Sequence, residues 1–330
     1  MPKIDLKSIK AASIISVFRA IADREKSTRA EIAQATGLSL MTVGKIADSF
    51  SALGITSEEK EVSSSVGRRA AVIRITDTYY SILLDLTSST YKCEIMNAGT
   101  GTIDRFSYAP SREFYPEENL LLFLKNLSLH ITNRYFPEYC MGIGIVLPDN
   151  PTPADEDVLR NLPQYIHGTL PEFASRTIAE SQTEASAFYS TYKRPESSGH
   201  VLLYCRPIGE LSSALVIDGT VLKGQNHAVG NMASWAEMGN FNRQESVQSI
   251  AAIIRRACAL LDPHEIILEA NAADEAQLKE ISNQLSKTSA EIGLNPPALR
   301  LNIGGARNAC AGLSIKLREL WLHQIISQEI

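Results

Sequence analysis

The chain has 330 residues, of which 44% are hydrophobic and 21% charged; this composition is typical of folded proteins and excludes wholesale disorder. No apolar run approaches the roughly 18 residues of a membrane helix, and the polar first residues do not fit a secretory signal. The formal net charge of −5 argues against nucleic-acid binding. However, residues 1–76 carry a balance of +4 and residues 77–330 a balance of −9. We therefore expect a small basic head on a larger acidic body.

The head is predicted to contain three helices in close succession. Apolar residues recur at helical spacing over residues 7–24 and again over residues 40–53. Between these stretches, Thr28 and Glu31 form the capping-box pattern that starts a short helix, and Gly37 is suited to end it. Two helices joined by a tight glycine turn are typical of a helix-turn-helix, whose second helix enters the major groove of DNA.

After the third helix, residues 55–75 are predicted to form two strands around a basic loop, which is the pattern of a wing. Polar and long side chains on the third helix suit base and phosphate contacts, and arginines at the tip of the loop suit a minor groove. The candidate DNA-contacting residues are Thr28, Arg29, Ser39, Met41, Thr42, Lys45, Arg68 and Arg69. A three-helix bundle that contacts protein is the alternative for this part of the chain.

The body contains an internal repeat. An order of strand, turn, strand, tight turn and strand begins at Ile82 and recurs from Val201, about 120 residues later. This repeat predicts two α/β lobes that face each other across a cleft. Helices are predicted over residues 117–134, 244–261, 274–292 and 306–328, with strands near residues 141–147, 266–268 and 299–303. The proline-rich, acidic stretch 149–157 is predicted to be a surface loop.

The five cysteines lie far apart, and none belongs to a Cys-x-x-Cys pair. This spacing excludes a zinc knuckle or a dithiol redox motif and predicts a reducing, cytoplasmic location.

The order of these features resembles the repressor branch of the ROK family (repressor, open reading frame, kinase). The resemblance covers nearly the whole chain and rests on short motifs: Gly67-Arg68-Arg69, residues 142–148, residues 161–163, Val216-Ile217-Asp218-Gly219, Leu261-Asp262-Pro263 and Gly304-Gly305-Ala306. It implies an α/β chain with a winged helix-turn-helix over residues 1–76, followed by a two-lobed actin-like (ribonuclease H-like, sugar-kinase) fold. Residues 77–195 would form the first lobe, and residues 196–330 the second lobe with dimerisation helices.

The residues that would make this body a kinase are absent from the expected positions. Kinases of the family cradle phosphates in glycine-lined turns. The turn after Asp85 has lost both glycines, and the second turn holds Ile208, Glu210 and Ser212 at the glycine positions. The family's catalytic aspartate falls on Gln182, which cannot act as a base.

The remaining family positions have also changed. The sugar-holding glutamate and the histidine that holds sugar and zinc fall on Asn231 and Ser234, and a double glycine near the adenine pocket falls on Glu269-Ala270. Glu184 is interpreted as structural or solvated. We therefore predict a non-catalytic body with no ATP, zinc or other cofactor.

Together, these features predict a cytoplasmic transcription regulator, specifically a repressor, that binds a double-stranded DNA operator as a homodimer. A sugar effector held by Asp85, Gln182 and Asn231 and an empty cleft that serves dimerisation alone are two open alternatives. Two other functions also remain open: a ROK-type kinase that phosphorylates a hexose or amino sugar with ATP, and a scaffold whose head binds protein.

Overall fold

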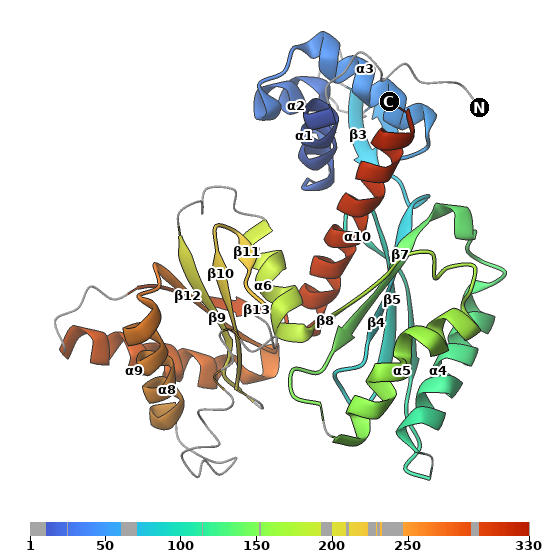
Figure 1. The fold of residues 1–330 in the computed structure, drawn as a ribbon. Coiled ribbons are helices and arrows are strands. Elements are labelled where there is room, and N and C mark those ends of the chain that lie inside the picture. The colour runs from blue at the N-terminus through green and yellow to red at the C-terminus, as the bar shows by residue number, and fades with distance from the viewer. Residues whose placement is uncertain are drawn as a thin grey trace.

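The computed structural model describes residues 11–24, 26–60, 71–113, 115–151, 153–192, 200–208, 211–223, 229, 232, 247–291 and 297–329. Six of the residues singled out in the sequence fall outside these ranges: Gly67, Arg68, Arg69, Glu210, Asn231 and Ser234. The described chain forms a head and a body with two β-sheets, joined by a long C-terminal helix that reaches from the body to the head (Figure 1).

The head consists of three helices and a small sheet with the strand order β1-β3-β2. Its elements are α1 (Ala11–Ala22), β1 (Ser27–Thr28), α2 (Arg29–Thr36), α3 (Leu40–Ala52), β2 (Thr56–Lys60) and β3 (Ala71–Ile75). The predicted capping box is confirmed: Thr28 Oγ1 accepts a hydrogen bond from Glu31 N at 3.3 Å, and Glu31 Oε2 accepts one from Thr28 N at 2.7 Å. Gly37 ends α2 with a φ of 68°, and Ser39 caps α3 by accepting from Thr42 N at 3.1 Å.

The two sheets of the body have the same topology. Their orders are β6-β5-β4-β7-β8 and β11-β10-β9-β12-β13. In each sheet the first strand in sequence pairs antiparallel with the second and parallel with the fourth. The first sheet contains β4 (Tyr80–Asp85), β5 (Tyr91–Asn97), β6 (Thr102–Tyr108), β7 (Cys140–Leu147) and β8 (Thr177–Ser181). The second contains β9 (Val201–Arg206), β10 (Ser212–Ile217), β11 (Thr220–Val221), β12 (Glu265–Ala270) and β13 (Ala298–Ile303). The internal repeat predicted from the sequence is therefore confirmed.

Helices cover both sheets. The outer helices α4 (Pro116–Ile131) and α5 (Pro153–Thr169) pack on the first sheet, and α8 (Val247–Leu261) and α9 (Glu275–Glu291) pack on the second. Two inner helices, α6 (Gln182–Tyr192) and α10 (Ala306–Glu329), lie between the sheets and against each other (Figure 1). We refer to the first sheet with α4, α5 and α10 as lobe 1, and to the second sheet with α6, α8 and α9 as lobe 2. No helix in the described ranges is long and apolar enough to cross a membrane.

One prediction for the body is wrong. The stretch 149–157 is not a surface loop throughout, because α5 begins at Pro153 and the Asp149 side chain is only 6% exposed. Proline is favoured in the first turn of a helix, and the acidic residues that follow it suit the positive end of the helix dipole. The composition that indicated a loop therefore marks the start of a helix.

The head contacts the body through α10. Phe18 of α1 packs edge-on against Trp321 of α10, with ring centroids 6.3 Å apart, and both belong to one hydrophobic cluster with the head's core. Arg19 of α1 donates two hydrogen bonds to Glu319 of α10, at 3.2 and 2.7 Å. The head is therefore fixed to α10 by both apolar and charged contacts.

Candidate functional site

The second helix of the helix-turn-helix pattern, α3, has one buried and one exposed face. Val43, Ile46, Ala47 and Phe50 are buried, as predicted from their spacing. Leu40 and Met41 are 60% and 71% exposed, and Lys45 is also exposed. Apolar side chains left in water beside a lysine suit a partner that offers both methyl groups and negative charge.

The other candidate side chains at this surface have partners within the head. Ser39 and Thr42 cap α3, and Thr28 caps α2. Arg29 donates to Glu58 at 3.1 and 2.7 Å and to Asp48 at 2.6 Å. These hydrogen bonds raise the pKa of Arg29 above its ordinary value, with the bond to Glu58 as the largest cause. Arg29 therefore ties α2 to α3 and β2.

The predicted wing is described only at its base. Strands β2 and β3 pair antiparallel, from Thr56 opposite Ile75 to Lys60 opposite Ala71. Arg68 and Arg69 follow β2 in sequence and lie outside the described residues, so their role stays a prediction.

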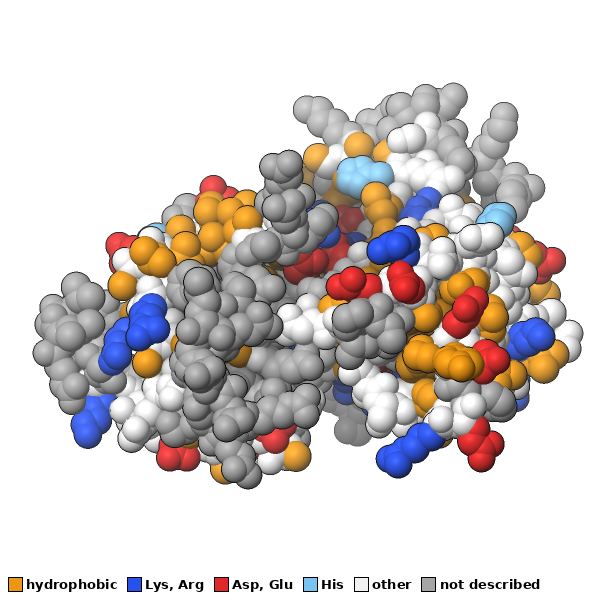
Figure 2. All heavy atoms as spheres, turned by 60° about the horizontal axis from the view of Figure 1, so that its bottom comes forward, with side chains coloured by type: hydrophobic (Ala, Val, Ile, Leu, Met, Phe, Trp, Pro, Cys, Tyr) orange, Lys and Arg blue, Asp and Glu red, His pale blue; other side chains and the backbone are white. Residues whose placement is uncertain are grey.

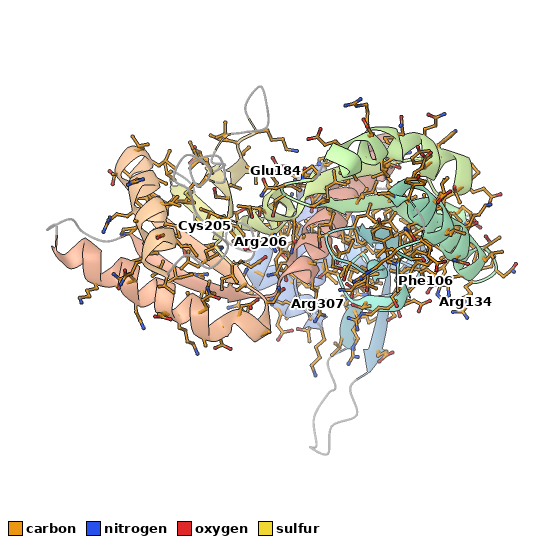
Figure 3. All side chains as sticks on the ribbon, turned by 90° about the horizontal axis from the view of Figure 1, so that it is seen from below. Phe106, Arg134, Glu184, Cys205, Arg206 and Arg307 are labelled. Carbon is orange, nitrogen blue, oxygen red and sulfur yellow. The ribbon has the colours of Figure 1, made fainter. Side chains whose placement is uncertain are left out.

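A pocket of about 270 Å³ lies at the junction of the two lobes. Side chains from both lobes line it, among them Asp149, Glu180, Ser181, Thr183, Glu184, Ser212, Ser213 and Lys223. Figure 3 places Glu184 and Arg206 at this junction, and Figure 2 shows acidic side chains gathered between the two halves of the body. The pocket is polar and charged, which suits a small hydrophilic ligand.

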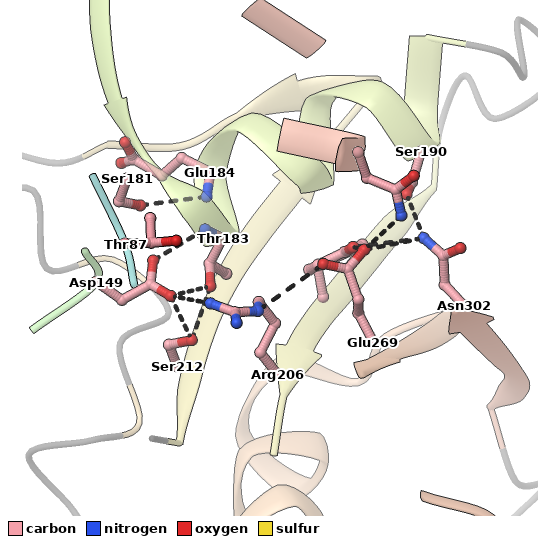
Figure 4. Close-up of polar contacts among 12 residues, drawn as sticks. Thr87, Asp149, Ser181, Thr183, Glu184, Ser190, Arg206, Ser212, Glu269 and Asn302 are labelled. Carbon is pink, nitrogen blue, oxygen red and sulfur yellow. Dashed lines mark hydrogen bonds and ion pairs between the residues drawn. The ribbon is translucent and has the colours of Figure 1, made fainter. Parts of the chain in front are cut away.

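Asp149 is the centre of the contacts beside this pocket (Figure 4). Its Oδ1 accepts from Thr183 N at 2.9 Å. Its Oδ2 accepts from Thr183 Oγ1 at 2.8 Å, from Arg206 Nη1 at 2.7 Å and from Ser212 Oγ at 2.9 Å. Asp149 follows β7 in lobe 1, whereas its three partners lie on α6, β9 and β10 of lobe 2. This carboxylate therefore links the two lobes.

A second charged group lies on the other side of the pocket. Glu180, at the end of β8, is bonded to Lys223 at 3.0 Å and to Lys316 of α10. Lys223 also lies 3.9 Å from Glu184. Glu184 is thus neither purely structural nor merely solvated, because it lines the pocket and faces a cation.

The three residues predicted to hold an effector do not all meet at this pocket. Asp85 is buried at the end of β4, where its Oδ1 accepts from Thr87 N at 3.0 Å and from Thr87 Oγ1. It lines a separate cavity of about 200 Å³ with Lys92 and Arg307. Gln182 is buried at the first residue of α6, between the pocket residues Ser181 and Thr183. Asn231 lies outside the described residues.

Glu269, predicted to replace a glycine near a nucleotide pocket, is a buried residue with its own hydrogen-bond network. Its Oε2 accepts from Asn302 at 3.1 Å, from Asn308 at 2.8 Å and from Tyr204. Its Oε1 accepts no hydrogen bond from the described part of the chain and lies 3.8 Å from Arg206 Nε. Burial raises the pKa of Glu269 above its ordinary value.

Sequence reasoning missed Asp149 and Arg206. Asp149 directly follows the apolar run of β7 and Pro148, and a carboxylate at the end of a buried strand is a usable signal for a site at that edge of a sheet. Arg206 follows β9 in the same way. Among the described residues, no group of three or more His, Cys, Asp or Glu side chains is arranged to hold a metal ion.

Comparisons with known proteins agree with this architecture. No family model and no curated protein matches the sequence. A crystal structure of a ROK family transcriptional regulator, a homologue of the E. coli MLC protein, covers 96% of this chain and 100% of its own, with a TM-score of 0.57 and 12% identity. The chain has the ROK fold.

Two further structures with this fold match a smaller part of the chain. A ROK family protein from Streptococcus pneumoniae, solved with sucrose, covers 75% of this chain and 99% of its own, with a TM-score of 0.51 and 12% identity. A protein of Listeria monocytogenes, described as a candidate N-acetylmannosamine kinase, covers 73% and 99%, with a TM-score of 0.51 and 11% identity.

Proposed function

We propose that this protein is a transcription regulator, specifically a repressor, that binds a double-stranded DNA operator as a homodimer. Residues 1–76 would be a winged helix-turn-helix domain. Residues 77–195 and 196–330 would be the two sequence halves of a two-lobed actin-like body, the second half with dimerisation helices. The observation that carries the proposal is the geometry of α3, which buries one face in the head and presents Met41 and Lys45 on the other. The extent of the match to a ROK regulator, 96% of the chain, supports it.

In this proposal Met41 and Lys45 contact the major groove, where thymine methyl groups and phosphates are within reach of such side chains. Ser39 and Thr42 hold the start of α3, and the Thr28 cap and Arg29 hold α2 against α3. Arg68 and Arg69 contact the minor groove or phosphates. Two heads on one dimer would bind two half-sites of a pseudo-palindrome.

We further propose that the body is not a kinase. Gln182 stands where the family has its catalytic aspartate and lacks a group that accepts a proton. In the turn after β4, the amide of Thr87 is already bonded to Asp85, so it is not free for a phosphate. Ser212, expected in the second turn, instead begins β10, where it is buried and bonded to Asp149 and Thr183.

The pocket between the lobes is the proposed effector site. Its hydroxyl, carboxylate and ammonium groups suit a sugar or a sugar derivative. Of the three residues predicted to hold an effector, Gln182 adjoins this pocket in sequence, Asn231 would still contribute to it, and Asp85 lines a separate cavity and is not part of the proposed site. The Streptococcus protein of this fold was solved with sucrose, which supports a carbohydrate ligand.

DNA binding is tested by titrating the purified protein into a labelled pool of random duplexes at several salt concentrations. We expect binding that weakens steeply with salt, because phosphate contacts release counterions. Lys45→Ala should reduce the slope of log K against log salt by about 1, and the double replacement of Arg68 and Arg69 by alanine by about 2. Lys279→Ala, at an exposed position of α9, is the matched control and should not change the slope. If the parent protein fails to bind DNA at low salt, the regulator proposal is excluded, and the alternative of a head that binds protein is favoured.

The kinase alternative is tested separately. The protein is incubated with ATP and a panel of hexoses and amino sugars, and sugar phosphate is measured. We expect no product above the background without enzyme. Appreciable phosphorylation would overturn the non-catalytic assignment, and replacing Glu184 with Gln would then show whether that carboxylate serves as the base.

A further inference from the structure

The head contacts two helices that pack on different sheets of the body. The first, α6, packs on the second sheet through Ala187, which lies in a cluster with residues of β9, β10 and β12. The other, α10, packs on the first sheet through Leu313 and Leu317, in a cluster with residues of β4 and β7. Both helices lie between the sheets and end close to the head (Figure 1). Through Ala185, α6 also belongs to the cluster of α10 and the first sheet, so it packs against both lobes. A shift of one lobe against the other must therefore change the contacts of α6 with at least one of them.

At the head, the end of α6 meets the middle of α10 in a polar joint. Tyr192, the last residue of α6, accepts a hydrogen bond from Arg318 Nη2 at 2.7 Å and donates one to Glu319 Oε1 at 3.0 Å. Arg318 is only 1% exposed and lies over the ring of Phe18 of the head, 5.4 Å from its centroid. Arg19 of the head binds Glu319 and lies 5.7 Å from the centre of the Tyr192 ring. The head thus contacts the end of α6 and the middle of α10 through the same few side chains.

The opposite end of α6 forms part of the junction between the lobes. Thr183, in its first turn, is bonded to Asp149 of lobe 1 and to Ser212 of lobe 2, the latter at 2.7 Å between hydroxyl oxygens. Thr183 also lines the pocket between the lobes. One helix of 11 residues therefore has the pocket at its first turn and the head joint at its last residue.

Between these two ends, α6 and α10 touch backbone to backbone. A Cβ atom at Gly312 of α10 would overlap the carbonyl oxygen of Ala185 of α6. The glycine therefore allows a crossing too close for any larger residue, and the two helices are in direct contact midway between the pocket and the head.

We propose that α6 transmits the closure of the lobes at the pocket to the head, and that Tyr192 is the positioning residue through which the head responds. The claim that this coupling regulates DNA binding rests on the function proposed above. The coupling itself, between the pocket and the head, concerns only contacts within the chain, so it can be tested without DNA and without an effector.

The experiment is hydrogen exchange by mass spectrometry on four variants of the full chain. Thr183→Val keeps the shape of the side chain but removes the hydroxyl that links the lobes, whereas Thr183→Ser keeps the hydroxyl. Tyr192→Phe keeps the ring but removes the hydroxyl of the joint. The fourth variant combines Thr183→Val with Tyr192→Phe. Amide exchange in α1 reports the joint, and exchange in α4, which lies on the outer face of lobe 1, serves as the internal control.

We expect Thr183→Val to speed exchange in α1 by about twofold or more. A twofold change corresponds to the lower end of the interaction energies usually found between coupled residues. Exchange in α4 should not change, and Thr183→Ser should match the parent. Tyr192→Phe should itself speed exchange in α1, and adding Thr183→Val should then have little further effect. Unchanged α1 exchange in Thr183→Val, or equal effects with and without Tyr192, would overturn the proposal. If Thr183→Val does not fold, Ser212→Ala takes its place. This variant removes the hydroxyl that bonds to Thr183 and Asp149, and the same changes in α1 exchange are expected of it.

Discussion

The two lobes share one strand order but use their buried carboxylates differently. In lobe 1, Asp149 follows the fourth strand, β7, and accepts hydrogen bonds from three residues of lobe 2. In lobe 2, Glu269 lies at the corresponding end of β12 and accepts from Tyr204, Asn302 and Asn308. Asp149 therefore takes all of its partners from the other lobe, whereas Glu269 takes two from its own sheet and one from the start of α10.

Arg206 lies between these two carboxylates. Its Nη1 is 2.7 Å from Asp149 Oδ2, whereas its Nε is 3.8 Å from Glu269 Oε1 (Figure 4). Asp149 thus receives a close charged partner and three further donors, while Glu269 has a distant cation and one oxygen without a hydrogen bond from the described residues. The comparison teaches that a duplicated fold places acidic groups at equivalent sites but does not give them equivalent surroundings.

The largest loss of stability is expected from removing Arg206, the cation that lies between both carboxylates. Arg206→Met keeps much of the buried stem but leaves Asp149 and Glu269 without it, and losing one partner of a buried pair typically costs about 3 kcal/mol or more. Urea unfolding at pH 7 measures this loss of unfolding free energy. Arg300→Met is the matched control on the same sheet, because Arg300 is half exposed and pairs with Glu265 at 3.2 Å. We expect that control to lose less than about 1 kcal/mol. Equal losses in the two variants would show that Arg206 is not the common support of the two sites.

The next largest loss of stability is expected where α10 crosses α6 between the lobes. Gly312→Ala places a methyl group against the carbonyl of Ala185, and overpacking of this kind costs about 2 kcal/mol. Gly168→Ala, in α5, is the control, because nothing lies within 4 Å of the added methyl group. That variant should gain up to about 1 kcal/mol from the higher helix propensity of alanine. Thermal unfolding of the two variants measures the difference, and a stable Gly312→Ala protein would mean that the two helices can separate at little cost.

The head and the internal repeat were predictable because their signals are local. Thr28, Glu31, Gly37 and Ser39 each act within three residues of their position, so the caps of α2 and α3 follow from the sequence alone. The alternating strands and tight turns of the repeat are local in the same sense.

The site between the lobes was not predictable in this way. Thr183, Arg206 and Ser212 lie 34, 57 and 63 residues from Asp149 in the sequence, and only the packing of both sheets brings them together. Arg29 shows a related limit. Its position suggested a phosphate contact, but Glu58 lies opposite it only after β2 has formed. Sequence patterns give the periodicity of a segment, whereas the partner of a charged side chain depends on the tertiary fold.

The smallest expected effect is on the pH dependence of stability, which should have opposite signs for the buried Glu269 and the partly buried Glu319. Burial raises the pKa of Glu269, so the folded state binds this proton more tightly than the unfolded state. Its contribution to stability is full below the unfolded pKa and is lost as the pH rises through the folded pKa. Glu269→Gln avoids that loss, and it should exceed the parent by about 1 kcal/mol at pH 7, with the gain vanishing near pH 4.

Glu319, in the head joint, should behave in the opposite way. Burial alone would raise its pKa, but the hydrogen bond from Arg19 holds the pKa below its ordinary value. Its contribution is therefore present above the unfolded pKa and is lost as the pH falls through the folded pKa, so Glu319→Gln should be less stable than the parent at pH 7 and approach it in acid. Urea unfolding of both variants and the parent between pH 4 and 7 gives the two differences. If they change in the same direction with pH, the Arg19 bond does not outweigh burial at Glu319, and the joint is held mainly by the apolar contact of Phe18 with Trp321.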